Sequence, residues 1–320
     1  MAKNLNDVVI VSALRSPIGR YNGKLKEYKS YELGEKVIKK NLIQSKVLGN
    51  EVDEVILGQV LTGDTGQNPA RQAAIRAGIS VDKTAYIINQ VCGSGLRAIV
   101  AGYQSLKLNE SKIIVAGGQE SMSNSEKDVM LKDGLIDAFN NYHMGVTAEN
   151  VAKKFNISRQ EQDEFALKSQ KKTQTAIIDN KFDEELIKIN QDGNILNKDE
   201  HARSGLKLSD LEKLKTVFKD NGTVTPGNSS GINDGAAALL LTTLEEAEKK
   251  SIKPLAKIVS WASVGVDPSL MGLGPIDAVR KAVKKAKWNL EEVDLFEINE
   301  AFAAQSIAVI RELGIDHDKV

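Results

Sequence analysis

Cys92, the one cysteine among 320 residues, lies in a sequence pattern that could make its thiol a nucleophile. A β-branched apolar run occupies residues 85–91, and apolar residues recur at helical spacing from Leu96 onward. The pattern predicts a strand-to-helix turn at Cys92, where the free N–H groups and the positive end of the helix dipole favour a thiolate. Gly93 and Gly95 would let a substrate carbonyl approach closely, and the backbone N–H of Cys92 could bind an oxyanion. These features are typical of a residue that attacks a carbonyl group.

Two other interpretations of this stretch are open on the local pattern. A single cysteine is most often a small buried hydrophobic residue. Residues 93–98 also fit the pattern G-x-G-x-x-A, and Glu120 ends a later strand, which favours a dinucleotide-binding turn. That fingerprint belongs on the first strand-helix turn, however, whereas strand-helix pairs begin earlier here, at Val8 and Glu54.

The composition argues against several classes of protein. Lys plus Arg and Asp plus Glu both number 43, so the formal net charge is zero and neither nucleic acid nor an anionic membrane is indicated as a partner. One cysteine excludes an internal disulfide and a cysteine-built metal site, and we expect no metal ion. The sequence shows neither the apolar core of a signal peptide nor a run of about 20 apolar residues. We therefore expect a cytoplasmic protein with two or three domains.

The elements that must position Cys92 follow an alternating order. Buried-type strands are predicted at residues 8–13, 52–60, 85–91 and 112–116, and helices at residues 31–43 and 69–77. Alternating strands and helices of this length are typical of a mostly parallel α/β sheet.

The middle of the chain has a different character, and the last part repeats the first. Residues 122–221 are more charged and mainly helical, which indicates an insertion, and residues 223–235 form a loop of small residues that could line a ligand site before a strand at 236–241. A strand at 256–260, a helix at 276–286 and a strand at 292–298 then repeat the order in which the chain began, and a helix at 303–313 corresponds to the one at 69–77.

Several motifs, in the right order, resemble those of the thiolase family and most closely its biosynthetic acetyl-CoA acetyltransferases. They are SALRSP at residues 12–17, NQVCGSG at 89–95, GGQESMS at 117–123, YHMG at 142–145, GNSSGINDG at 227–235 and NEAF at 299–302. The resemblance covers nearly the whole chain. Several motifs in register are more specific than one glycine pattern, so the dinucleotide interpretation loses most of its weight.

The resemblance implies a five-layered α/β/α/β/α fold of two similar halves with an inserted loop domain, the second half being incomplete. We expect the N-terminal half at residues 1–121 and 231–253, the loop domain for CoA at 122–230 and the C-terminal half at 254–320. It also implies Claisen condensation of two acetyl-CoA molecules and the reverse thiolysis of acetoacetyl-CoA, with CoA thioesters as substrates and no further cofactor.

The resemblance also implies roles for individual residues. Cys92 would take the acyl group as a thioester, and Asn299 would hold a water near the enolate oxygen. The remaining residues would bind CoA or its acyl group: His143 and Met144 at the short acyl pocket, Arg203 and Ser230 at the nucleotide and pantetheine, and Phe218, Ala301 and Phe302 along the pantetheine tunnel. Without the family, His143 is an ordinary half-buried histidine and Asn299 a helix N-cap.

The sequence also departs from the family. Thiolases carry a His-Pro-x-Gly turn with the activating histidine and a Cys-x-Gly-Gly-Gly turn with the proton-transferring cysteine, and neither occurs in these 320 residues. We therefore expect little or no turnover unless a second polypeptide supplies both. The alternatives are a non-catalytic thiolase remnant that binds CoA or pairs with another subunit, and a 3-ketoacyl-CoA thiolase of broader chain length. Because residues 124–130 are short and polar, we expect a homodimer through the strand after Lys112 rather than a tetramer.

Overall fold

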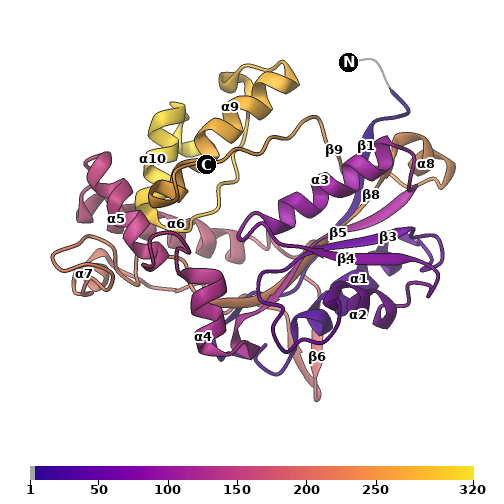
Figure 1. The fold of residues 1–320 in the computed structure, drawn as a ribbon, viewed down its shortest axis with the longest axis horizontal. Coiled ribbons are helices and arrows are strands. Elements are labelled where there is room, and N and C mark those ends of the chain that lie inside the picture. The colour runs from indigo at the N-terminus through magenta and orange to yellow at the C-terminus, as the bar shows by residue number, and fades with distance from the viewer. Residues whose placement is uncertain (1–3) are drawn as a thin grey trace. The chain divides into compact units, whose positions relative to one another are not determined.

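A seven-stranded mixed sheet organises the N-terminal part of the chain in the computed structural model, which describes residues 4–320 (Figure 1). The strand order is β4-β3-β5-β8-β1-β9, with β2 paired to β8. These strands are β1 Val8–Arg15, β2 Gly19–Arg20, β3 Glu54–Gly58, β4 Thr84–Ile88, β5 Ile113–Ser121, β8 Asn233–Thr243 and β9 Ala256–Lys257. A separate hairpin joins β6 Ile189–Gln191 to β7 Asn194–Leu196.

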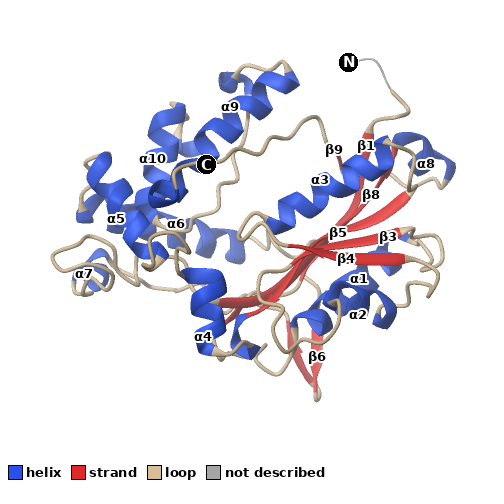
Figure 2. Cartoon of the chain, in the orientation of Figure 1, coloured by secondary structure: helices blue, strands red, loops and turns tan. Residues whose placement is uncertain are grey.

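Helices cover the sheet and are the main regular elements of the rest of the chain (Figure 2). They are α1 Ser30–Ser45, α2 Pro69–Arg76, α3 Ser94–Lys107, α4 Lys127–Val129, α5 Met144–Lys154, α6 Arg159–Ile178, α7 Leu208–Glu212, α8 Leu244–Lys249, α9 Gly274–Ala286 and α10 Ala303–Leu313. The α/β class expected from the sequence is confirmed. None of the helices in the described residues is long and apolar enough to cross a membrane.

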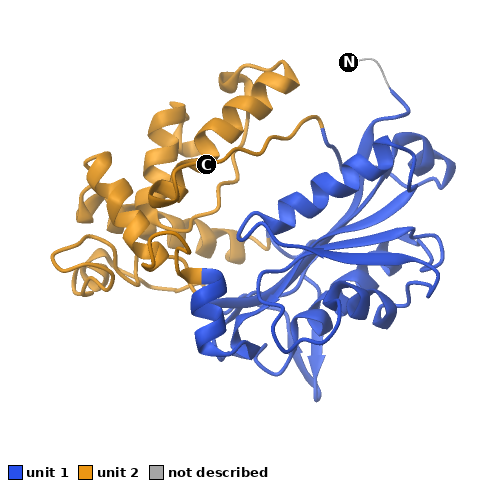
Figure 3. Cartoon of the chain, viewed as in Figure 1, with its two compact units in different colours: residues 1–134, 181–201, 232–258 blue, residues 135–180, 202–231, 259–320 orange. Residues whose placement is uncertain are grey.

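The chain divides into two compact units (Figure 3). Unit 1 contains the sheet and lies within residues 1–134, 181–201 and 232–258, whereas unit 2 consists of residues 135–180, 202–231 and 259–320. The inserted segment is shared, because its β6-β7 hairpin belongs to unit 1 and α5, α6 and α7 belong to unit 2. The division into two thiolase halves and a loop domain stays a prediction.

Both faces of the sheet in unit 1 are buried, which explains why its strands are apolar at consecutive positions. Val55 and Leu57 of β3 belong to the core cluster on the side of α1 and α2, whereas Ile56 between them belongs to the cluster on the side of α3. Successive side chains of a strand point to opposite faces, so a run without polar residues requires cover on both sides. Helices α1 and α2 supply one cover, and α3 supplies the other.

The sheet is mixed, and the expectation of a mostly parallel sheet is wrong. Only β3 pairs in parallel, with β4 and with β5, whereas β8 is antiparallel to both β5 and β1. The reason is the long insertion between β5 and β8. Without a short strand-helix-strand crossover, β8 is not constrained to enter the sheet in the same direction as β5.

The strands expected in the second half do not form a second sheet in the described residues. The strand predicted at residues 256–260 is reduced to β9, which adds to the edge of the first sheet beside β1. Residues 293–302 contain no strand, although the helices α9 and α10 form where the repeat predicts them. A strand is stable only beside hydrogen-bonded neighbours, and β-propensity alone cannot supply them.

The strand after Lys112 is β5, and it cannot offer an edge to a second copy. Its hydrogen-bonding groups are taken by β3 on one side and by β8 on the other. The choice of this strand for edge-to-edge pairing in a dimer is therefore wrong, and the edge strands of the described sheet are β4 and β9. The homodimer itself stays a prediction.

Unit 2 is built around α10, which is buried on nearly every side. Its residues from Ala303 to Ile310 are all buried, and they contribute to clusters shared with α5, α6 and α9. An apolar helix of this kind must be covered on all sides, so α10 is held firmly in unit 2. Residues 299–302 directly precede α10, and their C-terminal end is therefore fixed in position.

Gly58 is the point where the sheet and α3 approach most closely. A Cβ atom at this position would lie 2.4 Å from the carbonyl carbon of Ser94 and 2.5 Å from the nitrogen of Gly95. We predict that Gly58→Ala lowers the free energy of unfolding by about 2 kcal/mol, because backbone atoms must shift to admit the methyl group. Urea denaturation followed by circular dichroism measures the change.

Gly95→Ala is the matched control for this substitution. Its Cβ would meet only Gly117, at an ordinary distance of 3.9 Å, and alanine is the better helix former. Equal unfolding midpoints for Gly58→Ala and the unmodified chain would show that the approach is not tight.

Candidate active site

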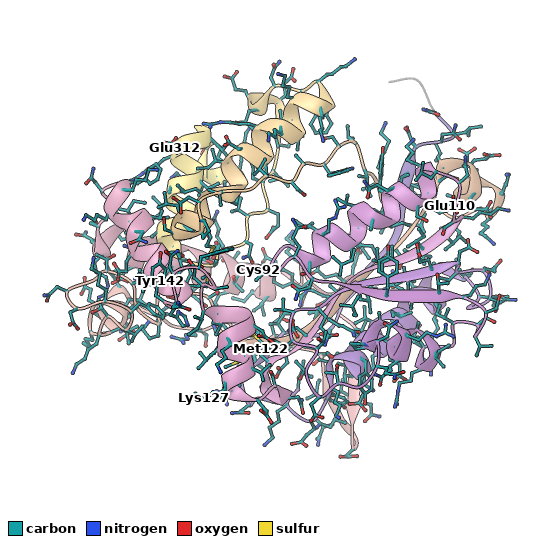
Figure 4. All side chains as sticks on the ribbon, in the orientation of Figure 1. Cys92, Glu110, Met122, Lys127, Tyr142 and Glu312 are labelled. Carbon is teal, nitrogen blue, oxygen red and sulfur yellow. The ribbon has the colours of Figure 1, made fainter. Side chains whose placement is uncertain are left out.

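Cys92 lies on the turn that joins β4 to α3, at the end of the sheet where the parallel strands finish. Ile88, Gly58 and Gly118 are paired neighbours near the ends of β4, β3 and β5. Cys92 follows β4 by four residues, and its side chain is exposed (Figure 4). The predicted strand-to-helix turn is therefore confirmed, and the interpretation of Cys92 as a buried core residue is wrong.

The backbone of this turn is held in an unusual conformation immediately before the cysteine. Val91 has φ +48°, a region that β-branched residues rarely adopt, and its side chain is 49% exposed. The Asn89 side chain accepts a hydrogen bond from the Val91 N–H at 2.9 Å. Strain of this kind persists only where neighbouring contacts impose it, and it is common at functional sites.

Ser94 supplies most of those contacts. Its buried hydroxyl accepts a hydrogen bond from the Gln90 N–H at 2.8 Å and donates one to the Val91 carbonyl oxygen at 2.5 Å. The serine of the Gly-Ser-Gly sequence thus closes the turn, and Gly95 lies over Gly117 of β5. The hydrogen bonds of Ser94 therefore give this residue a structural role in the turn that involves no dinucleotide.

The thiol of Cys92 is not poised as a thiolate, so the expectation from the helix N-terminus is wrong in this respect. Surrounding protein atoms desolvate the sulfur and raise the pKa of the Cys92 thiol above its ordinary value of 9.0. The backbone N–H of Cys92 lowers this pKa, whereas the carboxylate of Glu120 raises it further. Although part of the residue remains accessible to solvent, desolvation outweighs the stabilising N–H.

Glu120 lies at the same edge of the sheet, two residues beyond Gly118 in β5. Its carboxylate accepts hydrogen bonds from the Val60 N–H at 2.8 Å and from the Leu61 N–H at 3.3 Å. Burial nevertheless raises the pKa of Glu120 to about 7, and the charge of Asp234 adds to the effect. The carboxyl group is therefore about half protonated at neutral pH.

Five of the predicted site residues come together in unit 2. The imidazole of His143 stacks on the ring of Phe218, with centroids 4.6 Å apart, and Phe218 meets Phe302 edge-on at 6.3 Å. Met144, Phe218 and Ala301 pack against the buried cluster that contains Phe302. A Cβ at Gly145 would lie 2.2 Å from the Phe218 ring, so glycine is required at this contact.

His143 is half-buried, as its residue type alone suggests, and it caps α5. Its Nδ1 accepts a hydrogen bond from the Gly145 N–H at 3.0 Å, and desolvation lowers the pKa of the imidazole. A neutral ring is therefore favoured, with its other nitrogen available for a contact.

Ser230 and Asn299 lie at the ends of two segments that run side by side in unit 2. The Ser230 N–H donates to the Ala301 carbonyl oxygen at 3.0 Å, and the Ala303 N–H donates to the Asn228 carbonyl oxygen at 2.9 Å. Asn299 is exposed and does not cap a helix, because α10 begins at Ala303 with Phe302 as its N-cap. The interpretation of Asn299 as a helix N-cap is therefore wrong.

Arg203 is exposed and makes few polar contacts. Its backbone N–H donates to the Gln170 side chain at 2.8 Å, and its guanidinium is exposed without a hydrogen bond or ion pair in the described part of the chain. Cys92 belongs to unit 1, and the other predicted site residues belong to unit 2.

Two carboxylates were not predicted from the sequence as parts of the site: Glu120, which acts electrostatically on the thiol, and Glu149 in α5. Glu149 is buried, although it lies between Ala148 and Val151 in an otherwise apolar helix face. An acidic residue at a buried helical position is a signal that could have identified it, because such a group needs donors nearby.

Comparison with known families gives a consistent result. The model described as "Thiolase, N-terminal domain" matches residues 8–128 and 124–245, and the model described as "Thiolase, C-terminal domain" matches residues 252–320. Together they account for nearly the whole chain.

Individual relatives give the same picture. The chain is 49% identical to an acetyl-CoA acetyltransferase of Rhizobium meliloti, in an alignment that covers 97% of this chain and 84% of the relative. It is 48% identical to a cytosolic acetyl-CoA acetyltransferase of Mus musculus, with 98% and 84% covered. The crystal structure of the Bacillus anthracis acetyl-CoA acetyltransferase superposes with a TM-score of 0.95 at 40% identity, covering 100% of this chain and 86% of that one.

The raised pKa of Glu120 makes a prediction about stability. Glu120 keeps its proton in the folded chain up to about pH 7, whereas in the unfolded chain it ionises near 4.5. The folded state therefore binds more protons between these values, and the free energy of unfolding falls by about 3 kcal/mol as the pH rises through this window. Glu120→Gln cannot ionise, so it should not lose stability as the pH rises. The urea midpoint of Glu120→Gln should therefore increase relative to that of the unmodified chain between pH 4.5 and 7.5.

The same substitution should also affect Cys92. Removing the carboxylate lowers the pKa of the thiol, so alkylation of Cys92 by iodoacetamide should reach half its maximal rate at a lower pH in Glu120→Gln. Superimposable pH profiles would contradict the electrostatic contact.

Proposed function

Because the chain belongs to the thiolase family, we propose that it is an acetyl-CoA C-acetyltransferase. The reaction condenses two acetyl-CoA molecules to acetoacetyl-CoA and free CoA, and its reverse is thiolysis. The observation that carries this proposal is the exposed Cys92 on the constrained turn before α3. The acetyl group as substrate rests on the names of the relatives.

Cys92 would accept the acetyl group in the first half of the reaction. Its sulfur attacks the thioester carbonyl, the bond from that carbon to the CoA sulfur breaks, and the proton of the Cys92 thiol passes to the departing CoA. The second acetyl-CoA then loses a proton from its methyl group, attacks the acetyl-cysteine and frees the thiolate, which is reprotonated. Since the pKa of Cys92 is raised, proton removal must accompany the attack.

The residues of unit 2 would bind the rest of the substrate. His143 and Met144 would close a short acyl pocket, and Phe218, Ala301 and Phe302 would line the pantetheine tunnel with the cluster they already form. Ser230 would contact pantetheine, and the exposed guanidinium of Arg203 would meet the phosphates of the nucleotide.

Further proposals concern Asn299 and the setting of the reaction. Asn299 would hold a water near the enolate oxygen. The substrates would be acetyl-CoA, acetoacetyl-CoA and CoA, without another cofactor, in the cytoplasm and in a homodimer. The mouse relative is named as cytosolic, which supports this location.

The first test is acetylation of Cys92 in the purified 320-residue chain. Incubation with acetoacetyl-CoA should add one acetyl group to the Cys92 peptide, detected by intact-protein and peptide mass spectrometry. Cys92→Ser should remain unmodified, because it removes the sulfur but preserves the size of the side chain.

The outcomes separate the candidate functions. A folded, CoA-binding chain that is never acetylated would overturn the enzymatic proposal and favour a CoA-binding or pairing subunit. Acylation by longer 3-ketoacyl-CoA substrates at the same rate as by acetoacetyl-CoA would favour a thiolase of broader chain length.

A further inference from the structure

Glu149 is a buried carboxylate without a cationic partner. It lies in α5 and is 6% exposed, and no lysine, arginine or histidine of the described chain forms an ion pair with it. Burying an unpaired carboxylate costs several kcal/mol unless hydrogen-bond donors compensate for the lost water. The donors that surround Glu149 therefore show what the carboxylate holds in place.

All of these donors belong to one loop of unit 2. The Thr223 N–H lies 2.8 and 2.9 Å from the two carboxylate oxygens, the Val224 N–H donates to Oε1 at 2.8 Å, and the Thr223 hydroxyl donates to Oε2 at 3.0 Å. Gly222 permits this approach, because a Cβ there would lie 2.2 Å from Oε1. Hydrogen bonds to an ionised acceptor are stronger than neutral ones, so the backbone of this loop is firmly tied to α5.

Hydrogen bonds in turn connect this loop to α6 and to the segment that carries Asn299. The Asn228 side chain accepts from the Thr225 N–H at 2.8 Å and donates to Asp163 of α6 at 2.9 Å, and Asn228 is 2% exposed. Beyond Asn228, the loop pairs with the segment before α10, through Ser230 to Ala301 and through a bridge between Ser229 and Phe302.

The same helix also presents the acyl-pocket residues. His143 caps α5 and Met144 is its first residue, so α5 holds the His143–Phe218 stack at its N-terminus and the loop backbone one to two turns later. Ala148, between these points, packs in the cluster with Val224 and Phe302. Helix α5 thus positions both the acyl-pocket residues His143 and Met144 and the backbone of the loop at Thr223 and Val224.

We propose that Glu149 is a positioning residue of the CoA site. By holding the backbone of Thr223 and Val224 against α5, it fixes the loop that ends at Ser230 and, through that loop, residues 299–302. This inference rests on the proposed function, because it assigns the loop to CoA.

The test compares Glu149→Ala with Glu149→Gln. Glutamine has the same shape, and its carbonyl oxygen can take the place of Oε1 and accept from the Thr223 and Val224 N–H groups. Its amide would donate to the Thr223 hydroxyl in place of Oε2, and only the second, 2.9 Å contact of the Thr223 N–H would be lost, so the loop should stay in place. Isothermal titration calorimetry with CoA should show an affinity about tenfold lower for Glu149→Ala and little changed for Glu149→Gln. Acetylation of Cys92 by acetoacetyl-CoA, followed by mass spectrometry, should be slower and need more substrate in Glu149→Ala than in Glu149→Gln, while alkylation of Cys92 by iodoacetamide without CoA should not change.

A second pair of variants keeps the test valid if Glu149→Ala fails to fold. Gly222→Ala displaces the carboxylate but does not remove it, and it should reproduce the loss of CoA affinity. Gly265→Ala is its matched control in the same unit, because a Cβ there meets no atom within 4 Å.

The results distinguish this inference from the proposed function. CoA binding by the unmodified chain without acetylation of Cys92 would overturn the function alone, and the affinities of the variants would still decide the role of Glu149. Unchanged CoA affinity in folded Glu149→Ala or Gly222→Ala, an equal loss in Glu149→Gln, or no CoA binding by the unmodified chain would overturn the inference.

Discussion

The pairing of β8 with two strands at once is the constraint on which unit 1 depends. β8 lies antiparallel between β5 and β1, and its backbone groups are bonded on both sides. A slip of one residue would turn the buried side chains of β8 to the opposite face, so both covered faces oppose it. The register of β8 sets that of β5, β3 and β4 in turn, and so fixes the positions of Glu120 and of the turn that carries Cys92 at the edge of the sheet.

At Cys92, desolvation outweighs the stabilisation of a thiolate by the helix N-terminus. The effect of a helix dipole on an exposed charge is about 0.3–1 kcal/mol, whereas desolvation can shift a pKa by several units. Surrounding atoms raise the pKa of Cys92, and burial also keeps Glu120 about half protonated at pH 7. A protonated thiol beside a half-protonated carboxyl group is stable in the resting chain, and the thiolate forms only when its proton is removed.

Unit 2 combines a small apolar cluster with a network of buried polar groups. The cluster around Phe302 is apolar, but apolar contacts are not directional and tolerate sliding. The hydrogen bonds of Glu149, Asp163 and Asn228 are directional, so they define the path of the loop between residues 222 and 231. Leaving any of these buried N–H groups unpaired would cost about 1–3 kcal/mol, which disfavours alternative loop conformations.

The local elements and the motifs that carry the chemistry could be predicted without the folded structure. Turn glycines, apolar periodicity and helix signals depend on neighbouring residues, so the turn at Cys92, the long helices of the insertion and helices α9 and α10 could be predicted. The family, too, follows from motifs that are read in order along the chain.

Only the tertiary structure decided which distant segments meet. The direction of β8, the absence of a strand at residues 293–302 and the burial of β5 on both edges depend on hydrogen-bond partners far away in the chain. The same is true of Glu120 and Glu149, whose surroundings come from segments about 60 and 74 residues distant. Propensity and spacing act over a few residues, whereas desolvation and the pairing of buried polar groups depend on everything that folding brings near.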